Sequence, residues 1–146
     1  MNIIKVTTSH PEIVREIISS HIDPSDRKGT IPDLGHLETL LKDDKTYLLA
    51  AMEGKEVFGY DLAYRFPSLY ESGYLAYLYD IEVKALHRRK GIGKALVQTM
   101  LELLKRDKVK EVWLGTGVDN PEGQGLFSAT GALKSEETFN DYTYYL

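Results

Sequence analysis

The segment best suited to binding chemistry is a short basic stretch with two glycines at residues 88–94. It consists of Arg88, Arg89, Lys90, Gly91, Ile92, Gly93 and Lys94. It stands between a strand-like and a helix-like stretch, where the backbone amides of a helix N-terminus can converge on an anion. The two glycines let a phosphate reach those amides, because neither carries a Cβ. The segment predicts a diphosphate site, although similar residues also occur as a helix start with solvated basic side chains.

Two carboxylates precede this segment and could act on a proton. Asp80 and Glu82 are two residues apart in a strand-like stretch, so we expect their side chains to project from the same face. A polar strand face is more often solvated than catalytic, but a carboxylate beside an anion-binding loop can serve as a general base. Both residues are therefore candidate catalytic groups.

Composition excludes several other kinds of site. The chain has no cysteine, which excludes disulfides, thiolate metal ligands and a cysteine nucleophile. Its four histidines lack metal-ligand spacing, so we predict no metal ion. The glycines form neither a P-loop nor a G-x-G-x-x-G fingerprint, which argues against ATP and NAD. The net charge of −4 argues against nucleic acid and suits a cationic substrate.

Length and hydropathy indicate one domain over residues 1–146. This length leaves no room for a second core, and the proportions of hydrophobic (42%) and charged (27%) residues are ordinary for a globular protein. The longest apolar runs are too short to span a bilayer, and the first residues lack a signal-peptide pattern. We therefore expect a cytoplasmic protein without a membrane partner.

The periodicity of the apolar residues predicts the elements that must position these side chains. Strands are predicted over residues 2–8, 46–52, 56–66, 74–83, 109–114 and 139–146, and helices over 13–18, 34–41, 92–106 and 120–130. A capping box, Ser9 and Glu12, predicts the start of the first helix, and the polar residues 22–32 predict a loop. The element order, with three successive antiparallel strands in the middle, indicates an α+β domain with a mixed sheet.

The basic segment resembles the acetyl-CoA pyrophosphate loop of the GCN5-related N-acetyltransferase (GNAT) family. Arg88, Gly91 and Gly93 have that loop's spacing, after a strand and at the start of an amphipathic helix. A second family signature is an asparagine followed by a helix with an aromatic residue near its end, and Asn120 and Phe127 are similar to it. The element order also matches the family. The resemblance implies a mostly antiparallel central sheet, about four flanking helices and acetyl-CoA as cosubstrate.

The same resemblance implies roles for individual residues. The backbone of Ile81 and Val83 would bind the pantetheine arm, residues 88–94 would hold the pyrophosphate, and Asn120 would contact the arm from a neighbouring strand end. Phe127 stands where the family usually has a tyrosine that protonates the departing thiolate. Phenylalanine has no proton to give, so water, the substrate or a C-terminal tyrosine would supply it, unless the step needs no acid.

A narrower resemblance covers about half of the chain, within residues 30–100. Leu34-Gly35, Phe66-Pro67, Tyr79-Asp80 and the stretches 45–51, 77–83 and 87–89 are similar to aminoglycoside 3-N-acetyltransferases of the GNAT type. This implies a polycationic small-molecule acceptor, acetylated at its 3-amino group, and a role in antibiotic resistance. An ammonium group cannot attack a thioester until a base takes its proton. Asp80 matches the subgroup better than Glu82 does, so we favour Asp80 as that base.

Other functions are compatible with the same residues. An acetyltransferase for a polyamine, an amino acid or a peptide N-terminus has the same requirements, and Phe127 is compatible with a non-catalytic acyl-CoA-binding sensor. Asp80 and Glu82 count against the sensor, because a pure binder needs no base. The family resemblance favours a homodimer. Most tyrosines should pack in strands, with one or two forming walls of an acceptor cleft.

Overall fold

The computed structural model describes residues 1–26 and 30–146 of the chain. The loop predicted over residues 22–32 therefore lies partly outside the described residues. The chain forms two compact units, Met1–Gly115 and Thr116–Leu146, and each is described by itself.

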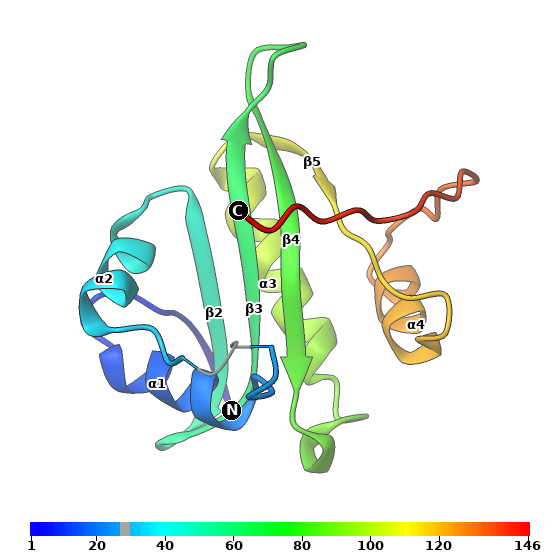
Figure 1. The fold of residues 1–146 in the computed structure, drawn as a ribbon. Helices are drawn as coiled ribbons and strands as arrows, with labels where there is room; N and C mark the ends of the chain where they lie inside the picture. Colours follow the sequence, from blue (N-terminus) through cyan, green and yellow to red (C-terminus); the bar gives the residue numbers. More distant parts are fainter. Residues whose placement is uncertain (27–29) are drawn as a thin grey trace. The chain divides into compact units, whose positions relative to one another are not determined.

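The first unit is built on a five-stranded sheet with the strand order β1-β2-β3-β4-β5. The strands are β1 (Asn2–Lys5), β2 (Thr46–Glu53), β3 (Glu56–Pro67), β4 (Tyr74–Val83) and β5 (Val109–Trp113). Neighbouring strands from β1 to β4 are antiparallel, whereas β5 runs parallel to β4 (Figure 1). The predicted α+β class, with three successive antiparallel strands and a mixed sheet, is confirmed.

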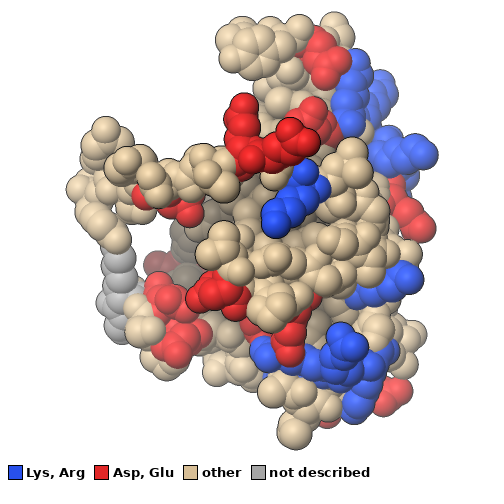
Figure 2. All heavy atoms as spheres, turned by 90° about the vertical axis from the view of Figure 1, so that its right-hand side faces the viewer, with Lys and Arg blue, Asp and Glu red and all other residues tan. Residues whose placement is uncertain are grey.

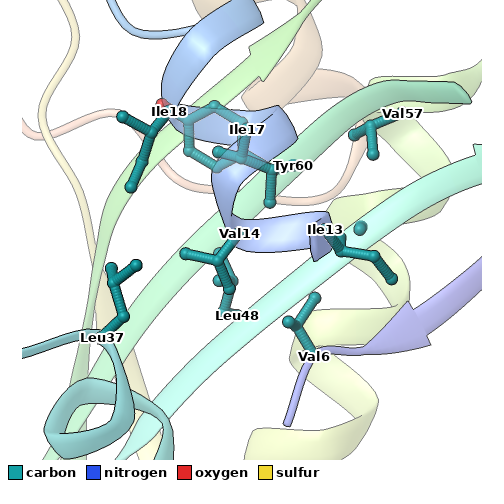
Figure 3. Close-up of a cluster of buried hydrophobic side chains, with 10 residues drawn as sticks. Val6, Ile13, Val14, Ile17, Ile18, Leu37, Leu48, Val57 and Tyr60 are labelled. Carbon is teal, nitrogen blue, oxygen red and sulfur yellow. The ribbon is translucent and has the colours of Figure 1, made fainter. Parts of the chain in front are cut away.

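Helices cover both faces of this sheet. They are α1 (Pro11–Ser20), α2 (Leu34–Lys42) and α3 (Ile92–Arg106), with a short 3-10 helix, η1, at Ala85–His87. Leu48 and Ala50 of β2 pack with α1 and α2 (Figure 3), whereas Leu49 and Ala51 pack with α3. Alternate residues of a strand point to opposite faces of the sheet. We therefore call the two sides of the sheet the α1 face and the α3 face.

The start of α1 differs from the prediction. The capping box at Ser9 and Glu12 is wrong, because the N-cap residue is His10 and it makes no side-chain capping hydrogen bond. Pro11 occupies the first helical turn, where its fixed φ and missing N–H are tolerated. The Ser9 amide instead donates to Thr7 Oγ1 at 3.3 Å. The helix therefore begins at the proline.

One irregularity in β4 decides which side chains share a face. Leu62 of β3 pairs with Asp80, but the next residue, Ala63, pairs with Leu78. Tyr79 is therefore an extra residue, a β-bulge in β4. The bulge keeps Asp80 on the same face as Tyr77, although the two positions are three residues apart.

The second unit contains one helix, α4 (Pro121–Ala129). Asn120 caps its start, and Gly131 follows its end with φ 95°, the left-handed conformation common after helices. The strand predicted over residues 139–146 is wrong, since this segment forms no strand and its aromatic side chains are exposed. A strand needs a neighbour for its backbone groups, and the described sheet ends at β5.

Candidate active site

β4 carries the two predicted catalytic carboxylates on the α1 face. Asp80 pairs with Leu62 and Glu82 pairs with Tyr60, and both of these β3 residues pack in or against the core beneath α1. The prediction that Asp80 and Glu82 share a face is therefore confirmed. Their role in catalysis stays a prediction.

A buried tyrosine holds the carboxylate of Asp80. The hydroxyl of Tyr60 donates a hydrogen bond to Asp80 Oδ2. The Tyr60 side chain is buried, and this burial together with the neighbouring Asp80 carboxylate raises the pKa of Tyr60 above its usual range. The ring of His21 meets Tyr60 edge-on, with the centroids 5.6 Å apart. Tyr60 is thus a fixed, protonated donor, while Asp80 itself is exposed and can meet a substrate.

Glu82 has a different partner. Its carboxylate accepts a hydrogen bond from Arg88 at 2.8 Å, and Arg88 Nε also donates to the carbonyl oxygen of Val83 at 2.9 Å. A charged side chain of the predicted phosphate segment is therefore tied back to β4. The ion pair offsets part of the charge on both groups, whereas the bond that Tyr60 donates to Asp80 comes from a neutral hydroxyl.

The segment between β4 and α3 is anchored on β3. The ring of His87 stacks on Phe58 with 4.1 Å between the centroids, and its Nε2 lies 3.2 Å from Glu56 Oε1. The Lys84 amide donates to the Phe58 carbonyl oxygen at 2.9 Å. These contacts fix the point from which residues 88–94 lead into α3. Figure 2 shows basic side chains grouped at its lower end, where Figure 1 places this connection.

The backbone of residues 88–94 turns sharply before it enters α3, and its role in binding an anion stays a prediction. Arg89 and Gly91 have positive φ values of 63° and 80°, and Gly91 is the N-cap residue of α3. Within the described part of the chain, no side chain caps this helix, so its first amides are available to a ligand or to water. An added Cβ at Gly91 would meet no atom within 4 Å. Its requirement for glycine is therefore the positive φ.

Asp61 is a buried carboxyl group that sequence reasoning missed. It lies on the α3 face of the central strand β3, paired with Leu49 and Ile81, and is 0% exposed. Among the described residues neither of its carboxyl oxygens has a hydrogen-bond partner. Burial, and to a lesser degree the charge of Asp80, raises the pKa of Asp61 to about 8. Asp61 is therefore mostly protonated at neutral pH.

The remaining predicted site residues lie in the other unit. The side-chain Oδ1 of Asn120 accepts a hydrogen bond from the Gly123 backbone amide at 3.0 Å, and its Nδ2 donates to Thr116 Oγ1 at 3.1 Å. Phe127 is a buried residue of α4. Asp80, Glu82 and residues 88–94 belong to Met1–Gly115, whereas Asn120 and Phe127 belong to Thr116–Leu146. Contacts of Ile81, Val83, Asn120 and Phe127 with a cofactor stay predictions.

Two other properties bear on the kind of site. Across residues 1–26 and 30–146 there is no group of three or more histidine, cysteine or acidic residues that could hold a metal ion. No helix in the same ranges is long and apolar enough to cross a bilayer.

The architecture is that of an acetyltransferase fold, with a glycine-containing turn between β4 and α3. The chain belongs to the Acetyltransferase (GNAT) family, which matches residues 11–132. Both the predicted family and the predicted fold are confirmed. Proteins of this family use acetyl-CoA.

Similar solved structures cover the chain almost completely. An aminoglycoside acetyltransferase from an uncultured soil metagenomic sample, solved in complex with sisomicin, has a TM-score of 0.87 and 21% identity, covering 99% of this chain and 95% of that one. Ribosomal-protein-alanine N-acetyltransferase from Brucella melitensis biovar Abortus 2308 has a TM-score of 0.73 and 20% identity, covering 98% and 100%. At these identities the likeness is one of fold.

Two curated relatives match a shorter region. N-acetyltransferase family 8 member 3 from Mus musculus is 37% identical over 67 residues, which are 46% of this chain and 29% of that protein. N-acetyltransferase 8 from Homo sapiens is 36% identical over 62 residues, which are 42% and 27%. The chain thus matches less than a third of the length of these relatives.

Proposed function

We propose that this protein is an acetyl-CoA-dependent N-acetyltransferase that acts on an amine of a small cationic substrate. The observation that carries the proposal is an exposed carboxylate, Asp80, on the strand that leads directly into the anion-binding turn of α3. With such an arrangement, one continuous segment would hold both the diphosphate of the donor and a base for the amine. Family membership supports the choice of acetyl-CoA as donor.

Each part of the proposed site would have its own role in cofactor binding or proton transfer. The amides after Gly91 would bind the diphosphate, and the backbone of Ile81 and Val83 would bind the pantetheine arm. Asp80 would take a proton from the substrate ammonium, directly or through one water. The free amine then attacks the thioester carbonyl, so that a C–N bond forms, the C–S bond breaks and CoA leaves as a thiolate. The new amide nitrogen then loses its second proton, and the sulfur gains one from the substrate, from water or from a tyrosine, because Phe127 has none to give.

The acceptor we favour is an aminoglycoside with a free 3-amino group. The Tyr79-Asp80 pair supports this choice, as does the fold likeness to an aminoglycoside acetyltransferase. The net charge of −4 would attract a polycation. Acetylation of the 3-amino group would remove one positive charge from the acceptor, which is the kind of change that gives antibiotic resistance. Polyamines and peptide amines are the alternative acceptors.

The test is a thiol-release assay with acetyl-CoA and a panel of amines, including gentamicin, spermine and an alanyl peptide. The variant Asp80→Asn keeps the shape of the side chain and removes the base, so kcat/KM should fall by about 10² to 10⁴ with acetyl-CoA affinity little changed.

Glu82→Gln is the matched control and should cost less, because Glu82 is engaged by Arg88. Full activity in Asp80→Asn with loss in Glu82→Gln would transfer the role to Glu82. No thiol release with any amine would refute the enzymatic proposal, and release with other amines but not gentamicin would refute the aminoglycoside acceptor alone.

A further inference from the structure

Five aromatic side chains form a continuous row across β3, β4 and β5. The aromatic row consists of Tyr64, Tyr79, Tyr77, Trp113 and Phe66, in order of contact. Their ring centroids are 5.6, 6.2, 5.9 and 5.6 Å apart, and each pair meets edge to face. Cross-strand pairing places Tyr77 opposite both Tyr64 and Trp113. Paired side chains share a face, so the row lies on the same side of the sheet as Asp80.

The row is not part of the hydrophobic core. Neither of the two buried apolar clusters includes any of its five members among the described residues. Tyr79 is 64% exposed and Trp113 is 44% exposed. Contiguous apolar surface of this kind, left open to solvent, marks a binding site more often than a scattered exposed ring does. Packing of the sheet therefore does not account for the row.

Carboxylates lie beside the row on this face. The positions paired across β3, β4 and β5 carry Asp80 and Glu111, together with Glu82, which is engaged in an ion pair with Arg88. Arg65 of β3 pairs with Ala76 and so belongs to the opposite, α3 face. An ammonium group over an aromatic face is attracted by the ring electrons, and nearby carboxylates strengthen that attraction. The surface thus has the chemistry to bind a cation.

We propose that the aromatic row is the acceptor-binding surface and that it takes a ring-bearing polycationic amine. Ammonium groups of the acceptor lie over the exposed rings of Tyr79 and Trp113 while another amine reaches Asp80. Asp80 and Tyr77 are three residues apart on β4, which corresponds to about 10 Å along the strand. Trp113 lies on the neighbouring strand β5, about 5 Å further across the sheet. A surface of this length fits two or three linked amino-sugar rings better than one small amine. The inference rests on the proposed function.

The chain provides its own probe, because Trp113 is its only tryptophan. Gentamicin, spermine and glucosamine are each titrated against Trp113 fluorescence, with and without saturating CoA, and the affinities are checked by calorimetry. Gentamicin should bind most tightly and glucosamine most weakly. Tyr79→Ala should weaken gentamicin binding by about 3- to 30-fold, since one cation–π contact is lost. In the acetyl-transfer assay it should raise KM for the amine and leave kcat little changed.

Tyr70→Ala is the matched control, because Tyr70 is 91% exposed in the turn between β3 and β4 and lies outside the row. Circular dichroism verifies that both variants are folded. Gentamicin affinity equal in the parent and Tyr79→Ala overturns the proposal, and so does an absence of gentamicin binding to the parent in calorimetry. Weakened binding in Tyr79→Ala supports the row even if no thiol is released from acetyl-CoA, a result that would refute only the enzymatic function.

Discussion

The buried carboxyl of Asp61 should make the stability of the protein depend on pH in a predictable way. Burial raises the pKa of Asp61 from 3.8 to about 8. Between pH 5 and pH 7 the unfolded chain carries Asp61 ionised, whereas the folded protein keeps it protonated, so unfolding releases a proton. The free energy of unfolding then falls by about 1.4 kcal/mol for each pH unit, or about 3 kcal/mol over this range. This contribution is complete below pH 3.8 and is lost as the pH rises through 8.

The variant Asp61→Asn cannot ionise and should not show this decline. Urea unfolding of the parent and the variant at pH 5, 6 and 7 gives two stability profiles. Their difference isolates Asp61 from the other titrating groups. Asp141→Asn is the control, because Asp141 lies in the exposed C-terminal segment and its removal should leave the parent profile unchanged. Parallel profiles for the parent and Asp61→Asn would show that the carboxyl is ionised in the folded protein and would refute the reasoning.

Two further substitutions test the loop and the carboxylate. Gly91→Val should lower the free energy of unfolding by about 1–2 kcal/mol, because φ is 80°, and abolish acetyl-CoA binding in calorimetry. Gly54→Val is the control, because it introduces a similar strain at φ 59° in the β2–β3 turn and should leave acetyl-CoA binding intact. Equal acetyl-CoA affinity in both variants would show that residues 88–94 do not bind the cofactor. Tyr60→Phe should lower kcat/KM about tenfold, because Asp80 loses its hydrogen bond. Tyr47→Phe is the control: it removes another buried hydroxyl, which donates to Asp107 at 2.7 Å, and it should lower stability without changing kcat/KM. An unchanged kcat/KM in Tyr60→Phe with a lowered kcat/KM in Tyr47→Phe would show that Tyr60 has no part in catalysis.

The elements around the candidate site could be predicted closely because their patterns are local. The strand predicted over residues 74–83 and the helix predicted over residues 92–106 have the same bounds in the structure. Residues 139–146 have an equally clear strand pattern, yet they form no strand. Whether an extended segment becomes a strand depends on a neighbour that supplies hydrogen bonds, and no local pattern encodes that neighbour.

Within the site, too, local features could be predicted from the sequence, whereas contacts between strands could not. The turn before α3 could be predicted, because its glycines and basic residues are contiguous; its binding of an anion stays a prediction. The contact between Tyr60 and Asp80 could not, since it joins residues 20 positions apart through the register of two strands. The aromatic row depends on three strands at once. Tyrosines could be recognised in the sequence as strand residues, but only the pairing of Tyr64, Tyr77 and Trp113 brings their rings together.

The bulge at Tyr79 makes this face of the protein tolerant of the loss of one residue. Leu62 pairs with Asp80 and Ala63 pairs with Leu78, so without Tyr79 the two strands would pair in an unbroken register. Asp80 would stay on the α1 face, and only the exposed ring of Tyr79 would be lost. A one-residue deletion here should therefore act like Tyr79→Ala on the acceptor, whereas one further regular strand residue inserted before Asp80 would turn its carboxylate toward α3.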